Sequence, residues 1–272
     1  MFKRVMGGFF VMVYMTFMFI FGGLTMNLML MILSLIGYYE LCRAFHIRPD
    51  EKKISSIECI GYISIIVIYL TQYFLPDLIY FLLTIVLTII AFLVVFVVRF
   101  PKYDAARIAE AVFSMLYCPV MLSFIYQTRN LEYGKYFVWL ILASAWLCDV
   151  FAFFAGKAFG KRKAFPALSP NKTVAGCIGG VIGATLGGVM FGLLLFLKLE
   201  EKGADCIWVF AIISFVAGVF AQFGDLAASG IKRHTGVKDY GSLIPGHGGV
   251  MDRFDSVLVT APIVYFLAVL FF

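Results

Sequence analysis

The chain has 272 residues, of which 62% are hydrophobic and 14% charged, and its net charge is +6. A water-soluble domain carries about 25% charged residues, so this composition excludes a soluble enzyme and predicts an all-α protein that crosses a membrane many times. The six cysteines lack C-x-x-C spacing, which argues against a zinc site or a disulfide framework.

Nine apolar runs approach the roughly 20 residues that a helix needs to cross a bilayer. They cover residues 5–22, 24–43, 57–75, 78–98, 112–127, 136–156, 175–197, 206–226 and 257–272. The first run follows two basic residues, as a signal peptide would, but no A-x-A-like cleavage site follows it, so we interpret it as a span. We expect an N-terminal membrane region over residues 1–135 and a C-terminal catalytic membrane region over residues 136–272.

The basic residues are distributed unequally between the two sides of these spans. Eighteen of the 22 Lys and Arg residues fall on the side of the N-terminus, and the other side has only Arg129, Lys135, Lys198 and Lys202. The positive-inside rule then predicts that the N-terminus is cytoplasmic. The positive charge is therefore a topology signal that also attracts anionic lipids, and it gives no reason to expect nucleic acid as a partner.

The seventh run is rich in glycines, several of them in G-x-x-x-G spacing: Gly176, Gly179, Gly180, Gly183, Gly187, Gly188 and Gly192. This spacing lets helix backbones approach closely in a membrane. Tight packing within one chain and a contact between two chains are both compatible with it.

Two acidic residues interrupt apolar runs. Asp149 lies in WLCDVFAFFAG and Asp225 in VFAQFGDLAAS. A carboxylate at membrane depth costs several kcal/mol unless it is paired, hydrated or bound to a metal. Both residues are therefore functional candidates, and a buried ion pair between helices is the structural alternative.

Two further acids begin the last run. Asp252 and Asp255 are three residues apart, which places both carboxylates on one face of a helix. Like charges this close favour a hard divalent cation with oxygen ligands. We therefore predict a metal site formed by Asp225, Asp252 and Asp255, with Asp149 as a ligand or a partner of the ligands. Arg253 points to another face, where it is expected to bind a phosphate through two hydrogen bonds.

The segment before these acids contains groups that suit a phosphate. The glycines of PGHGG allow close backbone approach, and successive N–H groups can form an anion cradle. Lys232, Arg233 and Lys238 are expected in the same cytoplasmic loop. A metal, a cradle and cations together indicate phosphoryl or nucleotidyl transfer.

Two long motifs resemble those of the phosphatidate cytidylyltransferases, also called CDP-diacylglycerol synthases. The stretch SGIKRHTGVKDYGSLIPGHGGVMDRFDS, residues 229–256, has every fixed position of the pattern S-x-x-K-R, K-D, P-G-H-G-G and D-R-x-D-S. The stretch DVFAFFAGKAFGKRKAFPALSPNKTVAG, from Asp149, is similar to the D-x-x-A-[YF], G-[RK]-x-F-G-[KR] and S-P-x-K-T-x-x-G elements. It departs from them at Val150, where a small residue is usual. The motifs cover about the second half of the chain.

The resemblance implies an integral membrane enzyme of phospholipid biosynthesis that converts CTP and phosphatidic acid to CDP-diacylglycerol and pyrophosphate. It implies Mg²⁺, a second cation with K⁺ as the candidate, a cytoplasmic active site in the cell membrane, and a homodimer. The expected catalytic residues are Asp225, Asp252, Asp255, Lys172 and Arg253. The expected substrate-binding residues are Ser169, Lys172, Thr173, Ser229, Lys232, Arg233, Lys238, His247, Gly248 and Gly249. For His247, a structural role in the bend is an equal alternative.

Two other functions fit parts of the pattern. A CTP-dependent polyprenol or phytol kinase would transfer the γ-phosphoryl group and release CDP. An ion-coupled transporter would use Asp149 and Asp225 to bind its coupling ion. The long motif over residues 229–256 favours the cytidylyltransferase, and no internal repeat of the kind found in transporters is evident.

Overall fold

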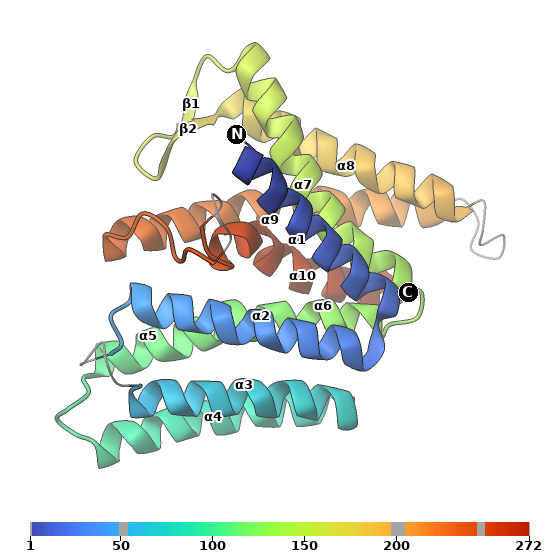
Figure 1. Ribbon diagram of the computed structural model, residues 1–272. Coiled ribbons are helices and arrows are strands. Elements are labelled where there is room, and N and C mark those ends of the chain that lie inside the picture. Colours follow the sequence, from blue (N-terminus) through green and yellow to red (C-terminus); the bar gives the residue numbers. More distant parts are fainter. Residues whose placement is uncertain (1, 49–53, 197–204, 244–247, 272) are drawn as a thin grey trace. The chain divides into compact units, whose positions relative to one another are not determined.

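The computed structural model describes residues 2–48, 54–196, 205–243 and 248–271, and Figure 1 shows their elements. The chain forms two compact units: unit 1 comprises Met1–Tyr126 and Thr235–Arg253, and unit 2 comprises Gln127–His234 and Phe254–Phe272. Within the described residues, eight helices are long and apolar enough to cross a membrane, and a shorter apolar helix precedes them. The predicted helical, multi-pass membrane architecture is thus confirmed. His247 lies outside the described residues.

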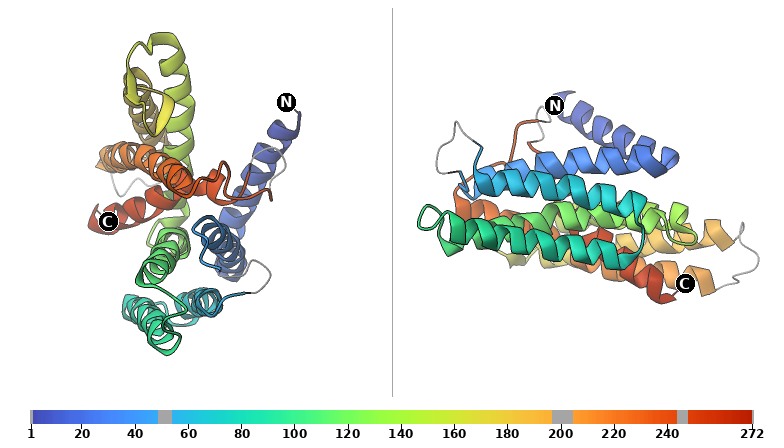
Figure 2. Two further views of the ribbon diagram at one scale, coloured as in Figure 1. Left: turned by 90° about the vertical axis from the view of Figure 1, so that its left-hand side faces the viewer. Right: turned by 90° about the horizontal axis from the view of Figure 1, so that it is seen from below.

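Unit 1 is built mainly from the helices of the first half of the chain. They are α1 (Phe2–Phe21), α2 (Gly23–Ala44), α3 (Ser56–Phe74), α4 (Leu78–Val98), α5 (Ala105–Met115) and the π-helical turn η1 (Leu116–Val120). Helices α2, α3, α4 and α5 lie side by side, and α5 contacts each of the other three (Figures 1 and 2).

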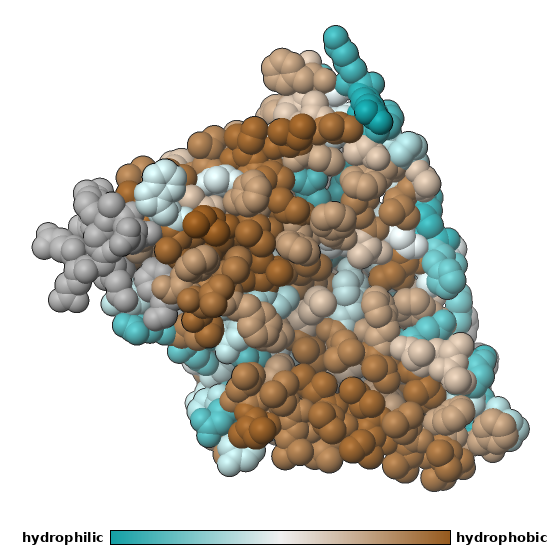
Figure 3. Space-filling model, turned by 180° about the vertical axis from the view of Figure 1, so that it is seen from behind, coloured by the Kyte–Doolittle hydropathy of each residue, from teal (hydrophilic) through white to brown (hydrophobic). Residues whose placement is uncertain are grey.

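Helix α4 has the pattern expected of a helix surrounded by lipid. Its buried residues form one narrow stripe at helical spacing: Phe81, Thr84, Thr88 and Phe92. Its other side chains are apolar and largely exposed; Val97 and Val98 are each 71% exposed. Figure 3, which views the molecule from behind, shows broad, continuous hydrophobic areas on the visible face. Such areas are expected where hydrocarbon takes the place of water.

Local chemistry sets the ends and the irregularity of two helices. Helix α3 starts with a capping box, in which the Ser55 hydroxyl accepts the Glu58 N–H at 3.1 Å and the Glu58 carboxylate accepts the Ser55 N–H at 3.0 Å. Asp104 caps α5 by accepting the Arg107 N–H at 2.8 Å, so the fifth span starts earlier than predicted. Pro119 lacks an N–H, and the helix widens into η1 around it before continuing as α6 (Met121–Arg129).

Unit 2 holds most of the second half of the chain. Its elements are α7 (Gly134–Phe159), β1 (Lys163–Phe165), β2 (Ser169–Thr173), α8 (Val174–Phe196), α9 (Asp205–Thr235) and α10 (Met251–Phe271), of which α10 begins in unit 1. The two strands form an antiparallel hairpin in which Lys163 pairs with Thr173 and Phe165 with Ser169. This hairpin is an addition to the all-α expectation.

The glycines of α8 serve close packing within unit 2. A Cβ atom on Gly180 would lie 2.8 Å from the Cys148 carbonyl oxygen of α7. A Cβ atom on Gly188 would collide with the Phe210 carbonyl oxygen of α9, and one on Gly192 would lie 2.7 Å from the Ile207 Cα atom. The glycines thus let two neighbouring helix backbones approach α8, which is the first of the two alternatives given by the sequence.

Helix α9 corrects one part of the sequence interpretation. The eighth apolar run was expected to end at residue 226 and to be followed by a loop, but α9 continues to Thr235. Ser229, Lys232 and Arg233 therefore lie on a helix, and only Lys238 lies beyond it. The residues after the apolar run are more polar on average, but most of them are compatible with a helix, so the helix extends beyond its hydrophobic part.

Candidate functional site

The central contact in unit 2 is an ion pair between the hairpin and α9. Lys172, on β2, places its Nζ atom 2.5 Å from Oδ2 of Asp225. The same Nζ donates a longer hydrogen bond, 3.4 Å, to the Gln222 carbonyl oxygen. The Lys172 and Asp225 side chains are 22% and 33% exposed, so the pair lies at an edge that solvent and ligands can reach. The sequence predicted a functional role for both residues but did not predict their pairing.

A second carboxylate lies in the electrostatic range of this pair. Asp255, in the first turns of α10, is repelled by Asp225 and more weakly by Asp149 of α7, and is attracted by Lys232 of α9. Its own Oδ1 accepts the Ser256 N–H at 2.8 Å. Gly224 makes the approach of α9 to α10 possible, because a Cβ atom there would lie 2.5 Å from the Asp255 carbonyl oxygen. Three of the four predicted acidic residues therefore interact within unit 2.

Thr173 joins the hairpin to α8. Its hydroxyl accepts the Gly176 N–H at 3.1 Å, which is the hydrogen bond of a helix N-cap. Three glycines of the predicted motif surround this side chain; a Cβ atom on Gly156 would be 3.1 Å from the Thr173 hydroxyl oxygen, and one on Gly160 would be 2.8 Å from it. The SPNKT segment is thus fixed at its C-terminal end, which holds the neighbouring Lys172 in place.

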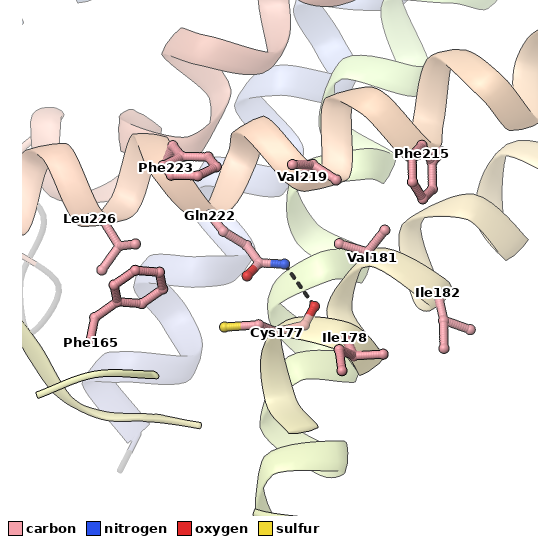
Figure 4. Close-up of a pocket in the computed structure, with 10 residues that line it drawn as sticks. All are labelled: Phe165, Cys177, Ile178, Val181, Ile182, Phe215, Val219, Gln222, Phe223 and Leu226. Atoms are coloured by element: carbon pink, nitrogen blue, oxygen red, sulfur yellow. Dashed lines mark hydrogen bonds between the residues drawn. The ribbon is translucent and has the colours of Figure 1, made fainter. Parts of the chain in front are cut away.

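Figure 4 shows an apolar cavity of about 380 Å³, and Gln222, one of the residues that line it, accepts a hydrogen bond from Lys172 through its backbone oxygen. Side chains of β1, α8 and α9 line it: Phe165, Cys177, Ile178, Val181, Ile182, Phe215, Val219, Gln222, Phe223 and Leu226. Several of these apolar side chains are about half exposed, so the cavity opens to the surface of the helices. Gln222 is the polar residue of the cavity. Its side-chain Nε2 donates a hydrogen bond to the Cys177 carbonyl oxygen at 2.8 Å, as Figure 4 shows, and its backbone carbonyl oxygen accepts the hydrogen bond from Lys172.

In unit 1, Asp252 holds together the two ends of a loop. Its Oδ2 accepts the Tyr240 N–H at 2.8 Å and the Gly249 N–H at 3.0 Å. Gly248 has φ +85°, a left-handed conformation that favours glycine, and a Cβ atom there would lie 2.7 Å from Asp252 Oδ2. The Gly249 N–H, predicted to bind phosphate, is thus engaged by the protein itself.

The structure adds a buried acid that the sequence interpretation missed. Glu40 of α2 is 3% exposed and accepts the N–H groups of Val250 and Met251 at 3.0 and 2.9 Å. The signal that singled out Asp149 and Asp225, an acid inside an apolar run, applies equally to Glu40.

The remaining predicted residues are distributed over both units. Ser169, Ser229 and Lys232 are half-buried in unit 2, where Arg233 is exposed, and Lys238 and Arg253 are exposed in unit 1. Within either unit, the described residues include no group of three His, Cys, Asp or Glu side chains that could hold a metal ion by themselves. Mg²⁺ commonly binds one or two carboxylates and completes its shell with water and substrate phosphates. The two carboxylates Asp225 and Asp255, which repel each other, fit the small number of carboxylate ligands that Mg²⁺ takes from a protein.

The fold and the site define a multi-pass membrane protein in which Lys172 pairs with Asp225, and Asp255 and Lys232 belong to the same unit. The model of the cytidylyltransferase family matches residues 2–271, and the chain belongs to this family of nucleotidyltransferase enzymes. It is similar to the phosphatidate cytidylyltransferase of Staphylococcus aureus strain COL, with 31% identity over 249 residues that cover 91% of each chain. It is also similar to the phosphatidate cytidylyltransferase of Bacillus subtilis strain 168, with 39% identity over 157 residues, 57% of this chain and 56% of that protein.

Proposed function

We propose that the chain is a phosphatidate cytidylyltransferase, which converts CTP and phosphatidic acid to CDP-diacylglycerol and pyrophosphate. One observation carries the proposal: in unit 2, Lys172 of the SPNKT motif pairs with Asp225, and the adjacent Gly224 of α9 packs against the backbone of Asp255 in the DRFDS motif. Residues far apart in the sequence thus form a single charged site of the kind that transfer between two polyanions requires. The similarity to relatives of that name supports the choice of substrates.

The reaction needs no nucleophilic side chain. An oxygen of the phosphatidic acid phosphate attacks the α-phosphorus of CTP, and the bond from that phosphorus to the oxygen bridging to the β-phosphorus breaks. Pyrophosphate leaves with the electron pair. The protein brings two polyanions together and balances their charge, which is the role that we assign to Lys172, Lys232, Arg233, Lys238 and Arg253.

Mg²⁺ is part of the proposal, and its ligands within unit 2 would be Asp225 and Asp255, with Asp149 as a ligand or a partner of the ligands. The family resemblance, not the arrangement of the units, assigns Asp252 to the metal as well. When bound, Mg²⁺ would withdraw charge from the phosphate oxygens at the reacting phosphorus. Lys172 holds Asp225 in the absence of substrate and, because its side chain is partly exposed, is placed to exchange this partner for a phosphate. The second cation, with K⁺ as the candidate, and the homodimer belong to the same proposal and rest on the family resemblance.

The apolar cavity suits one acyl chain of the lipid substrate. It opens to the surface of α8 and α9, where hydrocarbon is expected, and its polar end at Gln222 leads to Lys172. A lipid with its chain in the cavity would present its phosphate to the Lys172 ammonium group. The charge asymmetry of the loops supports a cytoplasmic position for this end of the helices, where CTP is available.

The test is an assay of both products. Protein purified in detergent micelles is supplied with Mg²⁺, CTP and phosphatidic acid, and pyrophosphate and CDP-diacylglycerol are measured together. We expect equal amounts of the two products, and we expect Asp255→Asn to abolish the reaction while leaving the circular dichroism spectrum unchanged. CDP in place of pyrophosphate would identify a CTP-dependent lipid kinase, and no CTP turnover would leave the transporter alternative.

A further inference from the structure

We propose that Glu40 is a positioning residue, which sets the direction of Asp252 and Arg253 by holding the first turn of α10. The Glu40 carboxylate is buried and accepts two consecutive backbone N–H groups, with Oε1 on Val250 and Oε2 on Met251. The inference rests on the proposed function, because the proposed function gives Asp252 and Arg253 a part in catalysis.

The chemistry of a helix start explains this contact. The first N–H groups of a helix have no partner within the helix and carry partial positive charge. A side chain near the helix start normally supplies the acceptor. Here the acceptor comes from Glu40, 210 and 211 residues away in the chain, and both of its oxygens are used. A buried carboxylate is stable only with such partners, so the position of Glu40 and the position of this first turn determine each other.

The buried Glu40 carboxylate leaves no room for a side chain at two nearby positions, and both are glycines. A Cβ atom on Gly241 would collide with Oε1 of Glu40, and one on Gly249 would collide with both of its oxygens. A Cβ atom on Gly241 would also lie 2.9 Å from the Gly249 Cα atom. Residues 240–241 and 249–250 therefore meet at Glu40, and we call these four residues the neck.

A second residue of α2 acts on the same neck. Arg43 lies one helical turn after Glu40, on the same face, and its Nη2 donates to the Tyr240 carbonyl oxygen at 2.7 Å. Tyr240 is buried, and its N–H is bound by Asp252 Oδ2, which also accepts the Gly249 N–H. Helix α2 thus holds both sides of the neck, and the orientation of the Asp252 carboxylate depends on the neck staying closed.

Unit 1 offers a matched control in Glu58. This carboxylate is also buried in a helix, also accepts a backbone N–H, and pairs with Arg48 at 2.7 Å. It caps α3 and does not contact residues 240–253 through any hydrogen bond found among the described residues. A change there tests the cost of losing a buried carboxylate without disturbing the neck.

The experiment compares Glu40→Gln with Glu58→Gln. Glutamine keeps the size of the side chain but replaces one acceptor oxygen by an NH₂ group that faces a backbone N–H. Hydrogen exchange followed by mass spectrometry should show faster exchange at Val250 and Met251 in Glu40→Gln by about tenfold and unchanged exchange there in Glu58→Gln. This readout does not depend on which reaction the protein catalyses.

Activity supplies the second readout. Partners that orient metal ligands typically contribute about 10- to 100-fold to metal affinity or activity. We expect Glu40→Gln to lower kcat by that factor and to raise the Mg²⁺ concentration for half-maximal rate, while Glu58→Gln changes neither. Unchanged exchange, or unchanged kcat and Mg²⁺ dependence, in Glu40→Gln would overturn the inference. Inactive wild-type protein with the expected exchange pattern would instead refute the proposed function, while the role of Glu40 in holding the first turn of α10 would stand.

If Glu40→Gln fails to fold, Arg43→Met gives the same test in a milder form. It removes the hydrogen bond to the Tyr240 carbonyl oxygen and the attraction between Arg43 and Glu40, but it leaves both Glu40 acceptor oxygens in place. We expect a smaller rise in exchange at Val250 and Met251 and a smaller rise in the Mg²⁺ requirement. Wild-type values for both measurements would contradict the role assigned to α2.

Discussion

Replacing Lys172 by methionine should destabilise the protein, and a second replacement should restore part of the loss. The Lys172 ammonium lies 2.5 Å from Asp225, which in turn faces Asp255. Lys172→Met keeps the apolar stem but removes the charge. Asp225 then lacks this partner and is left beside a like charge, so the variant loses an attraction and retains a repulsion.

The expected magnitude follows from the exposure of the pair. A hydrogen bond between charged groups contributes about 1.5–3 kcal/mol. The side chains are 22% and 33% exposed, so solvent screening brings the value toward the lower end, about 1–2 kcal/mol. We therefore expect Lys172→Met to lower the free energy of unfolding by about 2 kcal/mol. Adding Asp225→Asn, which removes the charge left without Lys172, should recover about 1 kcal/mol.

The assay is a double-mutant cycle in detergent micelles with EDTA present, so that bound cations do not contribute. Unfolding by sodium dodecyl sulfate, followed by circular dichroism, gives the free energies for the wild type, both single variants and the double variant. Lys163→Met is the matched control, because Lys163 is exposed on the paired strand β1 and forms no salt bridge among the described residues. Additive single effects, within about 0.3 kcal/mol, would refute the reasoning.

Four further predictions test other parts of the molecule. Thr173→Val removes the N-cap of α8 and should lower the free energy of unfolding by about 1 kcal/mol, whereas Thr173→Ser should keep it, as chemical unfolding would measure. Gly188→Val places a side chain against the Phe210 carbonyl oxygen and should cost about 3 kcal/mol in the same measurement. Val181→Trp fills the apolar cavity and should raise KM for long-chain phosphatidic acid about tenfold while leaving KM for CTP unchanged. Chelation by EDTA should abolish pyrophosphate release, and added Mg²⁺ should restore it; activity that persists in EDTA would exclude the metal from the proposal.

Hydrophobicity made the helices predictable. Span four was expected at 78–98, and α4 has those bounds, because an apolar run flanked by Asp77 and Arg99 has well-defined ends. Span eight was predicted too short, since hydropathy marks the part of a helix inside the bilayer and not where the helix ends. The hairpin at residues 163–173 was not predicted, because its short polar strands lack the alternation of apolar residues that indicates a sheet.

The composition of the candidate site was predictable from the motifs, but its contacts were not. Nothing in the sequence states that Lys172 pairs with Asp225, because the partner of a charge depends on how β2 and α9 pack. The contacts of Glu40 were unpredictable for a related reason, although its position inside an apolar run marked it as a candidate. Its partners are backbone N–H groups, which every residue except proline has, so no residue type near position 250 announces the contact.

The length of α9 has a consequence for the membrane in which the protein works. Its 31 residues span about 46 Å at 1.5 Å per residue, whereas the hydrocarbon layer is about 30 Å thick. The final turns of α9, with Lys232 and Arg233, therefore extend beyond the hydrocarbon layer as part of one continuous helix. The height of these cations above the headgroups then follows the thickness of the host bilayer. Vesicles made from lipids of different chain length would place the same cations at different depths, so catalytic rate should vary with the surrounding lipid even when the substrate is unchanged.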